Sequence, residues 1–213
     1  YLPTHSGYLA LGSSQAAAFI KSHNSVEYSD IEISFRPMTF SFNDNGQADI
    51  DPYNAISASI YRVRPSSRGE ILLNRENPKE KPLFYPNYLH TEDDRSAMIN
   101  GIRRARQIFE SKPISEYILT EIAPGANITT DQQISDFIDA NAKCAYHPVG
   151  TCKMGSDNLS VVDSRLRVNG IQGLRVIDAS IMPIITSGNT NAPSIMIGEK
   201  GAAMIIEDFN QAN

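Results

Sequence analysis

One histidine of the 213-residue chain lies in a loop sequence that could present it for chemistry. His147 begins the run His147-Pro-Val-Gly-Thr-Cys152, in which Pro148 stops a helix and Gly150 lets another backbone segment come close. A free imidazole has a pKa of about 6.5, so it can accept a proton near neutral pH. The run therefore makes His147 a candidate base, and a histidine that only anchors the loop is the alternative.

Two later segments could complete a site around this histidine. Residues 174–180 (Leu-Arg-Val-Ile-Asp-Ala-Ser) predict a short apolar strand ending at Asp178, typical of a buried parallel strand whose carboxyl end faces a ligand crevice. Residues 187–193 lead into an apolar run, and Pro193 suits the first turn of a helix because its missing N–H needs no partner there. The apolar residues of this run extend too far round a helix for one face, which predicts burial on several sides: Ile195, Met196, Ile197, Ala202, Ala203, Ile205 and Ile206.

The motifs of several other site classes do not occur in the chain. It has no Gly-Lys dipeptide for a phosphate-binding loop and no Gly-x-Ser-x-Gly for a serine hydrolase. The four histidines, at positions 5, 23, 90 and 147, share no metal-ligand spacing, so we expect no metal site. Cys144 and Cys152 are too few for a disulfide framework, and we expect both to be buried, reduced thiols.

Composition narrows the possible partners and location. The formal net charge is −5, and the basic residues are scattered apart from Arg103-Arg104-Ala-Arg106, so we expect no nucleic-acid partner. No apolar run approaches the roughly 20 residues needed to span a bilayer, and the N-terminus lacks the pattern of a signal peptide. We expect a cytoplasmic protein, either free or held at a membrane surface.

The elements that must position the site begin with an antiparallel sheet. Residues 31–42 alternate apolar and polar, Asn43-Asp-Asn-Gly46 supplies a tight turn, and residues 56–63 resume the alternation. A further short strand is expected at residues 71–73. This pattern predicts a sheet with one face in contact with solvent.

Two helices should follow the sheet. Thr91 and Asp94 resemble a helix start, after which Met98, Ile102, Ala105 and Phe109 fall on one helical face, which we expect to pack on the sheet; Arg103-Arg104-Ala-Arg106 falls on the exposed side. A second helix starts at Thr130, where Gln133 completes a capping box, and it should bury Ile134, Phe137 and Ile138. The fold class expected is α+β, with a boundary near residue 140.

From Tyr146 onward the chain resembles the C-terminal signature of the glucose–methanol–choline family of flavin oxidoreductases. The matching motifs cover most of residues 146–205: His147-Pro-Val-Gly-Thr-Cys-Lys-Met-Gly155, Val162-Asp163, Leu174-Arg-Val-Ile-Asp-Ala-Ser-Ile-Met-Pro183, Gly188-Asn-Thr-Asn-Ala-Pro193 and Ile195-Met-Ile-Gly-Glu-Lys200. Arg64-Pro-Ser-Ser-Arg-Gly69 and Pro86-Asn-Tyr-Leu89 resemble landmarks of the family's substrate domain. The resemblance implies a substrate-binding domain over residues 1–140, truncated at its N-terminus, and the C-terminal strand and helix of an FAD-binding α/β domain over residues 141–213.

The resemblance also implies roles for individual residues. His147 matches the family's active-site histidine, which takes the hydroxyl proton of an alcohol while hydride leaves for the flavin. Asn189 matches a partner position that would hydrogen-bond the developing alkoxide, with a turn-forming asparagine as the alternative. Residues matching the family's FAD site are Asp178, Ala179, Thr190, Asn191, Ala192 and Pro193, although Asp178 could instead fix a turn. Tyr146, beside the base, is a candidate substrate contact.

One family element has no counterpart in this chain. The Gly-x-Gly-x-x-Gly turn that cradles the pyrophosphate does not occur, so we expect the chain alone to lack FAD and to be inactive, with the N-terminal FAD-binding portion as its partner. The expected function is therefore the C-terminal portion of an FAD-dependent alcohol dehydrogenase or oxidase that forms an aldehyde. Its motifs look particularly like those of choline dehydrogenases, and either oxygen or a quinone could accept the electrons. A non-catalytic binding or structural domain derived from this family is the alternative.

Overall fold

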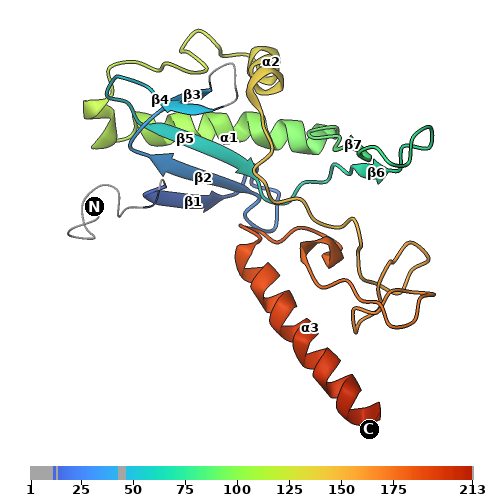
Figure 1. Cartoon of the computed structure of the whole chain (residues 1–213). Coiled ribbons are helices and arrows are strands. Elements are labelled where there is room, and N and C mark those ends of the chain that lie inside the picture. The colour runs from blue at the N-terminus through green and yellow to red at the C-terminus, as the bar shows by residue number, and fades with distance from the viewer. Residues whose placement is uncertain (1–11, 13, 43–46, 213) are drawn as a thin grey trace. The chain divides into compact units, whose positions relative to one another are not determined.

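The computed structural model describes residues 12, 14–42 and 47–212, which form three α-helices and several small antiparallel sheets (Figure 1). The chain divides into two compact units. The first unit comprises residues 1–62 and 92–142, and the second comprises residues 63–91 and 143–213. The assignment of residues 1–140 to substrate and 141–213 to cofactor stays a prediction.

The first unit is built on the predicted antiparallel sheet. Its strands β1 (Ala16–Ile20), β2 (Ile31–Arg36) and β5 (Ser57–Arg62) lie in the order β1-β2-β5, and β3 (Phe40–Phe42) pairs with β4 (Ala48–Ile50). The single alternating run expected over residues 31–42 is divided between β2 and β3, since Pro37 has no N–H to donate to a ladder. The turn expected at residues 43–46 lies outside the described residues.

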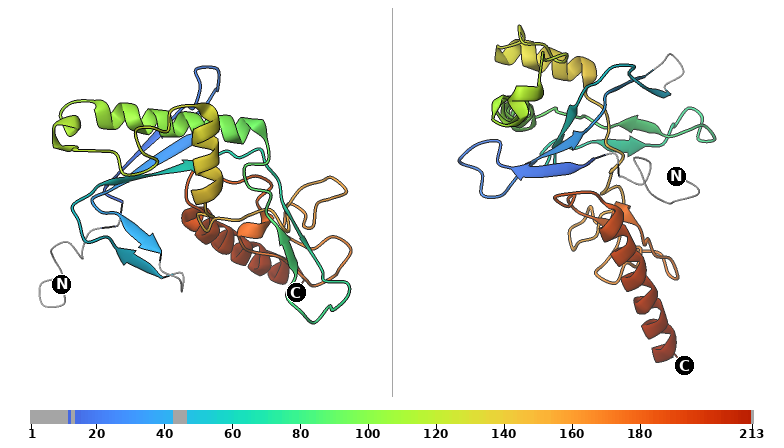
Figure 2. Two further views of the ribbon diagram at one scale, coloured as in Figure 1. Left: turned by 90° about the horizontal axis from the view of Figure 1, so that it is seen from above. Right: turned by 90° about the vertical axis from the view of Figure 1, so that its left-hand side faces the viewer.

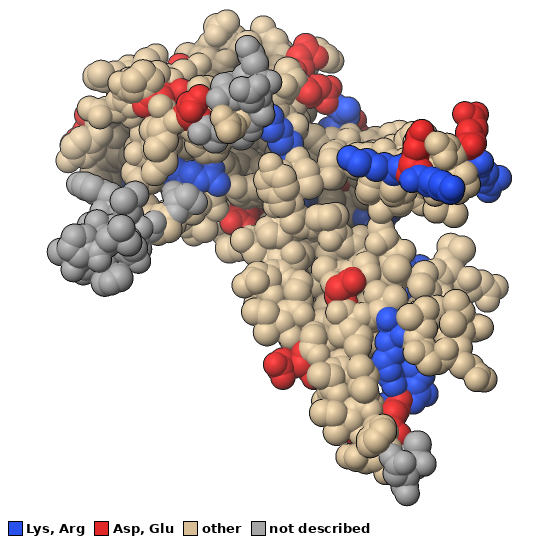
Figure 3. All heavy atoms as spheres, viewed as in Figure 1, with Lys and Arg blue, Asp and Glu red and all other residues tan. Residues whose placement is uncertain are grey.

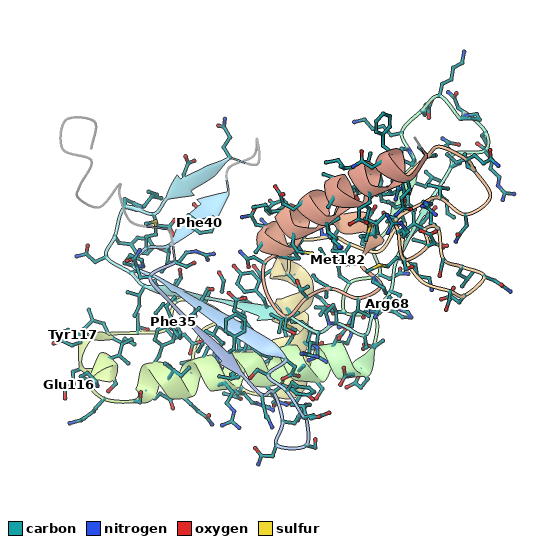
Figure 4. The ribbon with its side chains drawn as sticks, turned by 90° about the horizontal axis from the view of Figure 1, so that it is seen from below. Phe35, Phe40, Arg68, Glu116, Tyr117 and Met182 are labelled. Atoms are coloured by element: carbon teal, nitrogen blue, oxygen red, sulfur yellow. The ribbon has the colours of Figure 1, made fainter. Side chains whose placement is uncertain are left out.

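Helix α1 (Glu92–Glu110) packs on this sheet, as the periodicity of its apolar residues predicts (Figures 1 and 2). Ala97 and Ala105 join the fully buried Ile31 and Ile33 in one core. The approach is close: a Cβ placed at Gly101 would lie 2.7 Å from Cγ2 of Ile60. At the far end of the helix, the ring of Phe35 meets that of Phe109 edge to face at 5.6 Å; Phe35 is marked beside α1 in Figure 4.

Helix α2 (Asp131–Asn141) begins as predicted, with a complete capping box between Thr130 and Gln133. It buries Ile134 and Ile138, and it is preceded by the short 3-10 helix η2 (Ile114–Tyr117). The prediction that the whole basic cluster of α1 is exposed is wrong for one residue. The Arg106 side chain is only 20% exposed, because its guanidinium pairs with Glu121 and donates to the carbonyls of Gly125 and Ile128.

A buried ion cluster joins three parts of the first unit. Arg62, at the end of β5, donates to Asp94 Oδ1 at 3.1 Å and to Asp93 Oδ2 at 2.6 Å, and it also pairs with Asp30. The exposed fractions of the Arg62, Asp30 and Asp94 side chains are 9%, 5% and 0%. Asp30 also accepts hydrogen bonds from the backbone and the hydroxyl of Ser22. Arg62 thus supplies the positive charge that balances two buried carboxylates, that of Asp30 just before β2 and that of Asp94 in α1.

The second unit combines a hairpin, a long looped segment and the last helix. The hairpin pairs β6 (Glu70–Leu72) with β7 (Leu83–Tyr85), and the looped segment ends in the 3-10 helix η3 (Ala179–Ile181). Helix α3 (Asn191–Ala212) packs on that segment. The core is formed by Val162, Leu166, Ile181, Met182 and Ile197. Figure 4 marks Met182 beside α3.

The strand expected over residues 174–180 does not form. Only Arg175 makes a bridge, an antiparallel one to Arg167, and the chain then turns into η3. A strand needs a neighbour that satisfies its backbone along its length. Residues 166–168 pair with this segment only around Arg175, where the Val168 N–H donates to the Leu174 carbonyl and the Val176 N–H donates to the Leu166 carbonyl, so no regular strand forms over residues 174–180.

Helix α3 forms as predicted, but the expectation that it is covered on several sides is not met among the described residues. Ile197 is buried, whereas Ile195 and Met196 are 60% and 57% exposed and Ile205 and Ile206 are 46% and 60% exposed. The second unit covers only the face that carries Ile197 and Met204. None of the helices described is both long and apolar enough to cross a membrane.

Two glycines of α3 give a matched test of this packing. A Cβ at Gly201 would clash with the side chain of Ile177, whereas a Cβ at Gly198 would meet nothing within 4 Å. We expect Gly201→Ala to destabilise the second unit by about 1–3 kcal/mol through overpacking, although alanine favours a helix by up to about 1 kcal/mol. Gly198→Ala should be neutral or stabilising. Thermal unfolding of both variants checks this, and equal melting temperatures would contradict the packing.

The C-terminal half of α3 is held by an arginine cluster. Asp208 pairs with Arg165 at 2.7 Å and with Arg167 and Arg175, and Glu207 pairs with Arg165 at 3.1 Å. Blue and red side chains meet near this end of the helix in Figure 3. Hydrogen bonds, first from Arg167 and then from Arg165 and Arg175, lower the pKa of Asp208 to about 2.

The cluster predicts an acid-sensitive contribution to stability. A carboxyl whose pKa is lower in the folded than in the unfolded state stabilises the fold above its unfolded pKa of about 3.9. We expect this contribution to be lost as the pH falls from about 4 towards 2. Melting curves of wild type and Asp208→Asn across that range check it. The difference between the two melting temperatures should be largest near neutral pH and shrink in acid, and a constant difference would contradict the assignment.

Candidate active site

The loop that carries His147 is fixed by its backbone. The N–H groups of Cys152 and Met154 donate to the carbonyls of Ser180 and Ile181 at 3.0 and 2.8 Å. Gly150 has a φ of +89°, and a Cβ there would lie 3.3 Å from the carbonyl oxygen of Met182. The expectation that glycine permits a close backbone approach is therefore confirmed. This ties the loop after His147 to residues 180–182.

His147 is half-buried and contacts the residue that precedes α3. Its Nδ1 lies 2.8 Å from Oγ1 of Thr190, and the backbone N–H of Thr190 points to the same nitrogen at 3.5 Å. Thr190 is only 7% exposed, and its carbonyl accepts hydrogen bonds from the backbone and the hydroxyl of Ser194. The imidazole is thus held at the first turn of α3, across 43 residues of sequence.

Asn189, the expected partner of His147, directly precedes Thr190 and is exposed. Among the described residues, no side-chain hydrogen bond is present for Asn189, so its amide is available to a ligand. The contact between Thr190 and His147 places the backbone of Asn189 in the same corner as the imidazole. The structure therefore brings the two predicted catalytic residues to one region of the second unit.

The first residues of α3 present backbone donors. Asn191 and Ala192 are exposed, and their N–H groups have no backbone acceptor within the part of the chain that is described. Pro193 lies in the first turn, where its missing N–H is tolerated. Because this end of a helix carries partial positive charge, it can accept a carbonyl oxygen or an anionic ring.

Asp178 and Ala179 lie at the start of η3. One carboxylate oxygen of Asp178, Oδ1, accepts the N–H of Ser180 at 2.7 Å and so caps the short helix. Asp178 therefore does fix a turn, the alternative that its sequence position left open. Its side chain remains exposed, so the other oxygen can still accept a hydrogen bond.

Tyr146, the candidate substrate contact, is 84% exposed and has a φ of +63°, an uncommon conformation for a residue other than glycine. Its N–H donates to Sγ of Cys144 at 3.2 Å. A hydrogen bond to Cys144 also raises the pKa of Tyr88 to about 12. No sequence signal pointed to this link, beyond the position of Tyr88 in the landmark at residues 86–89. Cys144 and Cys152 are free thiols, and both are half-buried rather than fully buried.

No three His, Cys, Asp or Glu side chains of the described residues are grouped so that they could hold a metal ion. The corner around His147 holds an imidazole, the exposed amide of Asn189 and the backbone donors at the start of α3. That set can move a proton and stabilise a negatively charged oxygen.

Comparison with known sequences identifies relatives of this chain. The chain is 41% identical over 194 residues to the oxygen-dependent choline dehydrogenase of Brucella melitensis biotype 1, covering 90% of this chain and 35% of that protein. It is 38% identical over 213 residues to an alcohol dehydrogenase (acceptor) of Pseudomonas putida, covering all of this chain and 38% of that one. The chain thus spans about a third of the length of these curated relatives.

Solved structures and the family pattern agree with these sequences. Pyridoxine 4-oxidase from Mesorbium loti matches with a TM-score of 0.78 and 26% identity, over 90% of this chain and 37% of that one. An FAD-dependent oxidoreductase from Chaetomium thermophilum matches with a TM-score of 0.70 and 26% identity, over 86% of this chain and 29% of that one. The sequence pattern described as GMC oxidoreductase matches residues 65–198, more than half of the chain. The chain therefore belongs to the GMC oxidoreductase family.

Proposed function

We propose that this chain carries the catalytic end of an FAD-dependent enzyme that oxidises a primary alcohol to an aldehyde. The observation that carries the proposal is the contact of His147 Nδ1 with Thr190 at the start of α3, in a member of the GMC oxidoreductase family. This contact leaves Nε2, on the other edge of the ring, free to meet a substrate.

In the proposed reaction His147 acts as a general base. Its Nε2 takes the hydroxyl proton of the alcohol, the electron pair of the O–H bond stays on oxygen, and a C=O bond forms as hydride leaves the same carbon. The Asn189 amide donates a hydrogen bond to the oxygen while negative charge develops on it. FAD, when bound, supplies the acceptor for the hydride.

The residues of this corner fit one end of the flavin. The free N–H groups of Asn191 and Ala192 suit the carbonyl-bearing edge of the ring, and the positive helix end favours its anionic reduced form by about 0.3–2 kcal/mol. Thr190 and Pro193 shape the same turn, and Asp178 and Ala179 lie at η3, which packs near α3. Because the chain lacks a Gly-x-Gly-x-x-Gly turn, we propose that the rest of the protein holds the pyrophosphate.

Choline or a similar alcohol is the proposed substrate. The choline dehydrogenases of Brucella melitensis and Pseudomonas fluorescens are 41% and 42% identical to this chain. An exposed aromatic ring beside the base, Tyr146, can lie against a quaternary ammonium group. The alcohol dehydrogenase (acceptor) of Pseudomonas putida makes an alcohol other than choline the second candidate.

The test uses the intact protein that contains this chain, loaded with FAD. Alcohols are added to it under anaerobic conditions. We expect choline or a simple primary alcohol to bleach the flavin absorbance and to yield the aldehyde. Readmitting oxygen, or adding a soluble quinone instead, then identifies the electron acceptor. A protein that binds no flavin, or whose flavin no alcohol reduces, would favour a non-catalytic domain.

A further inference from the structure

The contact between His147 and Thr190 is closer and better shielded than a surface contact. The distance of 2.8 Å from Nδ1 to Oγ1 lies within the usual hydrogen-bond range. The backbone N–H of Thr190 could donate only to a lone pair on Nδ1, but at 3.5 Å it lies beyond that range and competes weakly with the hydroxyl. Thr190 is only 7% exposed, so little water reaches its hydroxyl. The hydroxyl is therefore the partner that fixes the ring.

The choice of ring nitrogen has a chemical consequence. A neutral imidazole carries its proton on one nitrogen and a lone pair on the other. A hydroxyl can donate or accept, but only when Thr190 Oγ1 accepts from an Nδ1–H does Nε2 keep its lone pair. No hydrogen bond joins Nε2 to any described residue, so none of these residues uses its lone pair.

We propose that Thr190 is the positioning residue of His147: its buried hydroxyl accepts a hydrogen bond from Nδ1–H and so keeps Nε2 as the proton-accepting nitrogen. The inference rests on the proposed function. The family resemblance placed Thr190 among the contacts to FAD. Here we propose instead that Thr190 acts on the reaction by orienting His147. Once Nε2 has taken a proton, the same hydrogen bond stabilises the imidazolium.

Three variants of the intact protein separate this role from simple packing. Thr190→Val keeps the shape of the side chain and removes the hydroxyl, and Thr190→Ser keeps the hydroxyl. Thr186→Val removes a hydroxyl from the same loop, and among the described residues that hydroxyl donates only to the carbonyl of Gly188, at 3.4 Å. We expect Thr190→Val to lower kcat roughly 10- to 100-fold with a smaller change in KM, Thr190→Ser to restore most of it, and Thr186→Val to have no effect.

A spectroscopic measurement tests the hydrogen bond without turnover. The protein is labelled with ¹⁵N-histidine, and the His147 ring signals are assigned by their loss in His147→Gln. In wild type and Thr190→Ser we expect the neutral ring to carry its proton on Nδ1, and in Thr190→Val to show a mixture of both forms. A proton on Nε2 in wild type, or unchanged signals in Thr190→Val, would overturn the inference. If the signals behave as expected but no alcohol is oxidised, the proposed function fails and the positioning by Thr190 stands.

Discussion

His147→Ala should reduce the rate of alcohol oxidation by the intact protein about 10²- to 10⁴-fold, the usual contribution of a positioned general base. In the structure the imidazole is held through Nδ1 at the start of α3, and Nε2 is left for the alcohol. Without the imidazole, the hydroxyl proton has no acceptor at this position. Steady-state kcat and kcat/KM with the best alcohol measure the effect.

His90→Ala is the matched control for this change. His90 is exposed and lies in the second unit, like His147, but has no place in the proposed site. We expect its removal to leave both constants unchanged. Equal rates for wild type and His147→Ala, with FAD still bound, would remove His147 from the mechanism.

Arg62→Met should lower the free energy of unfolding of the first unit by about 3–5 kcal/mol. Arg62 is the cation of the cluster that includes Asp30 and the fully buried Asp94. Removing one partner of a buried ion pair leaves carboxylate charge in a poorly solvated place, which costs more than the pair itself contributes. Urea unfolding followed by circular dichroism measures the change.

An exposed ion pair of the same unit gives the comparison. Arg103 pairs with Asp131, and their side chains are 42% and 68% exposed. Such pairs contribute about 0–1 kcal/mol because water screens them, so Arg103→Met should have little effect. If the two variants unfold at the same urea concentration, the buried cluster does not stabilise the first unit in the way described.

The parts of the fold that were predicted correctly depend on short-range signals. The capping box of Thr130 and Gln133 and the apolar spacing of α1 each lie within a few turns of one helix, and the structure shows both. The apolar run over residues 174–180 predicted a strand wrongly, since strand formation depends on a neighbour that local sequence does not supply. Arg106 was expected on a solvated face, but its partners come from a loop 15 to 22 residues away.

In the candidate site, too, short-range motifs could be predicted from the sequence and long-range contacts could not. His147 and Asn189 could be selected from their motifs, and the structure brings their segments to one corner. The proposed role of Thr190 could not be predicted from the sequence. Its hydroxyl meets a side chain 43 residues away, and no local signal beside a helix start identifies that partner. The turn-fixing role of Asp178 was open in the sequence and became clear only from its bond to Ser180.

We propose that His147 accepts the proton of the alcohol. The most direct test is the rate of anaerobic flavin reduction by the alcohol, measured in wild type and in His147→Ala with FAD bound to both. We predict that the flavin of the variant is reduced about 10²- to 10⁴-fold more slowly, because the hydroxyl proton has lost its acceptor. Equal rates of flavin reduction in the two proteins would show that another group is the base.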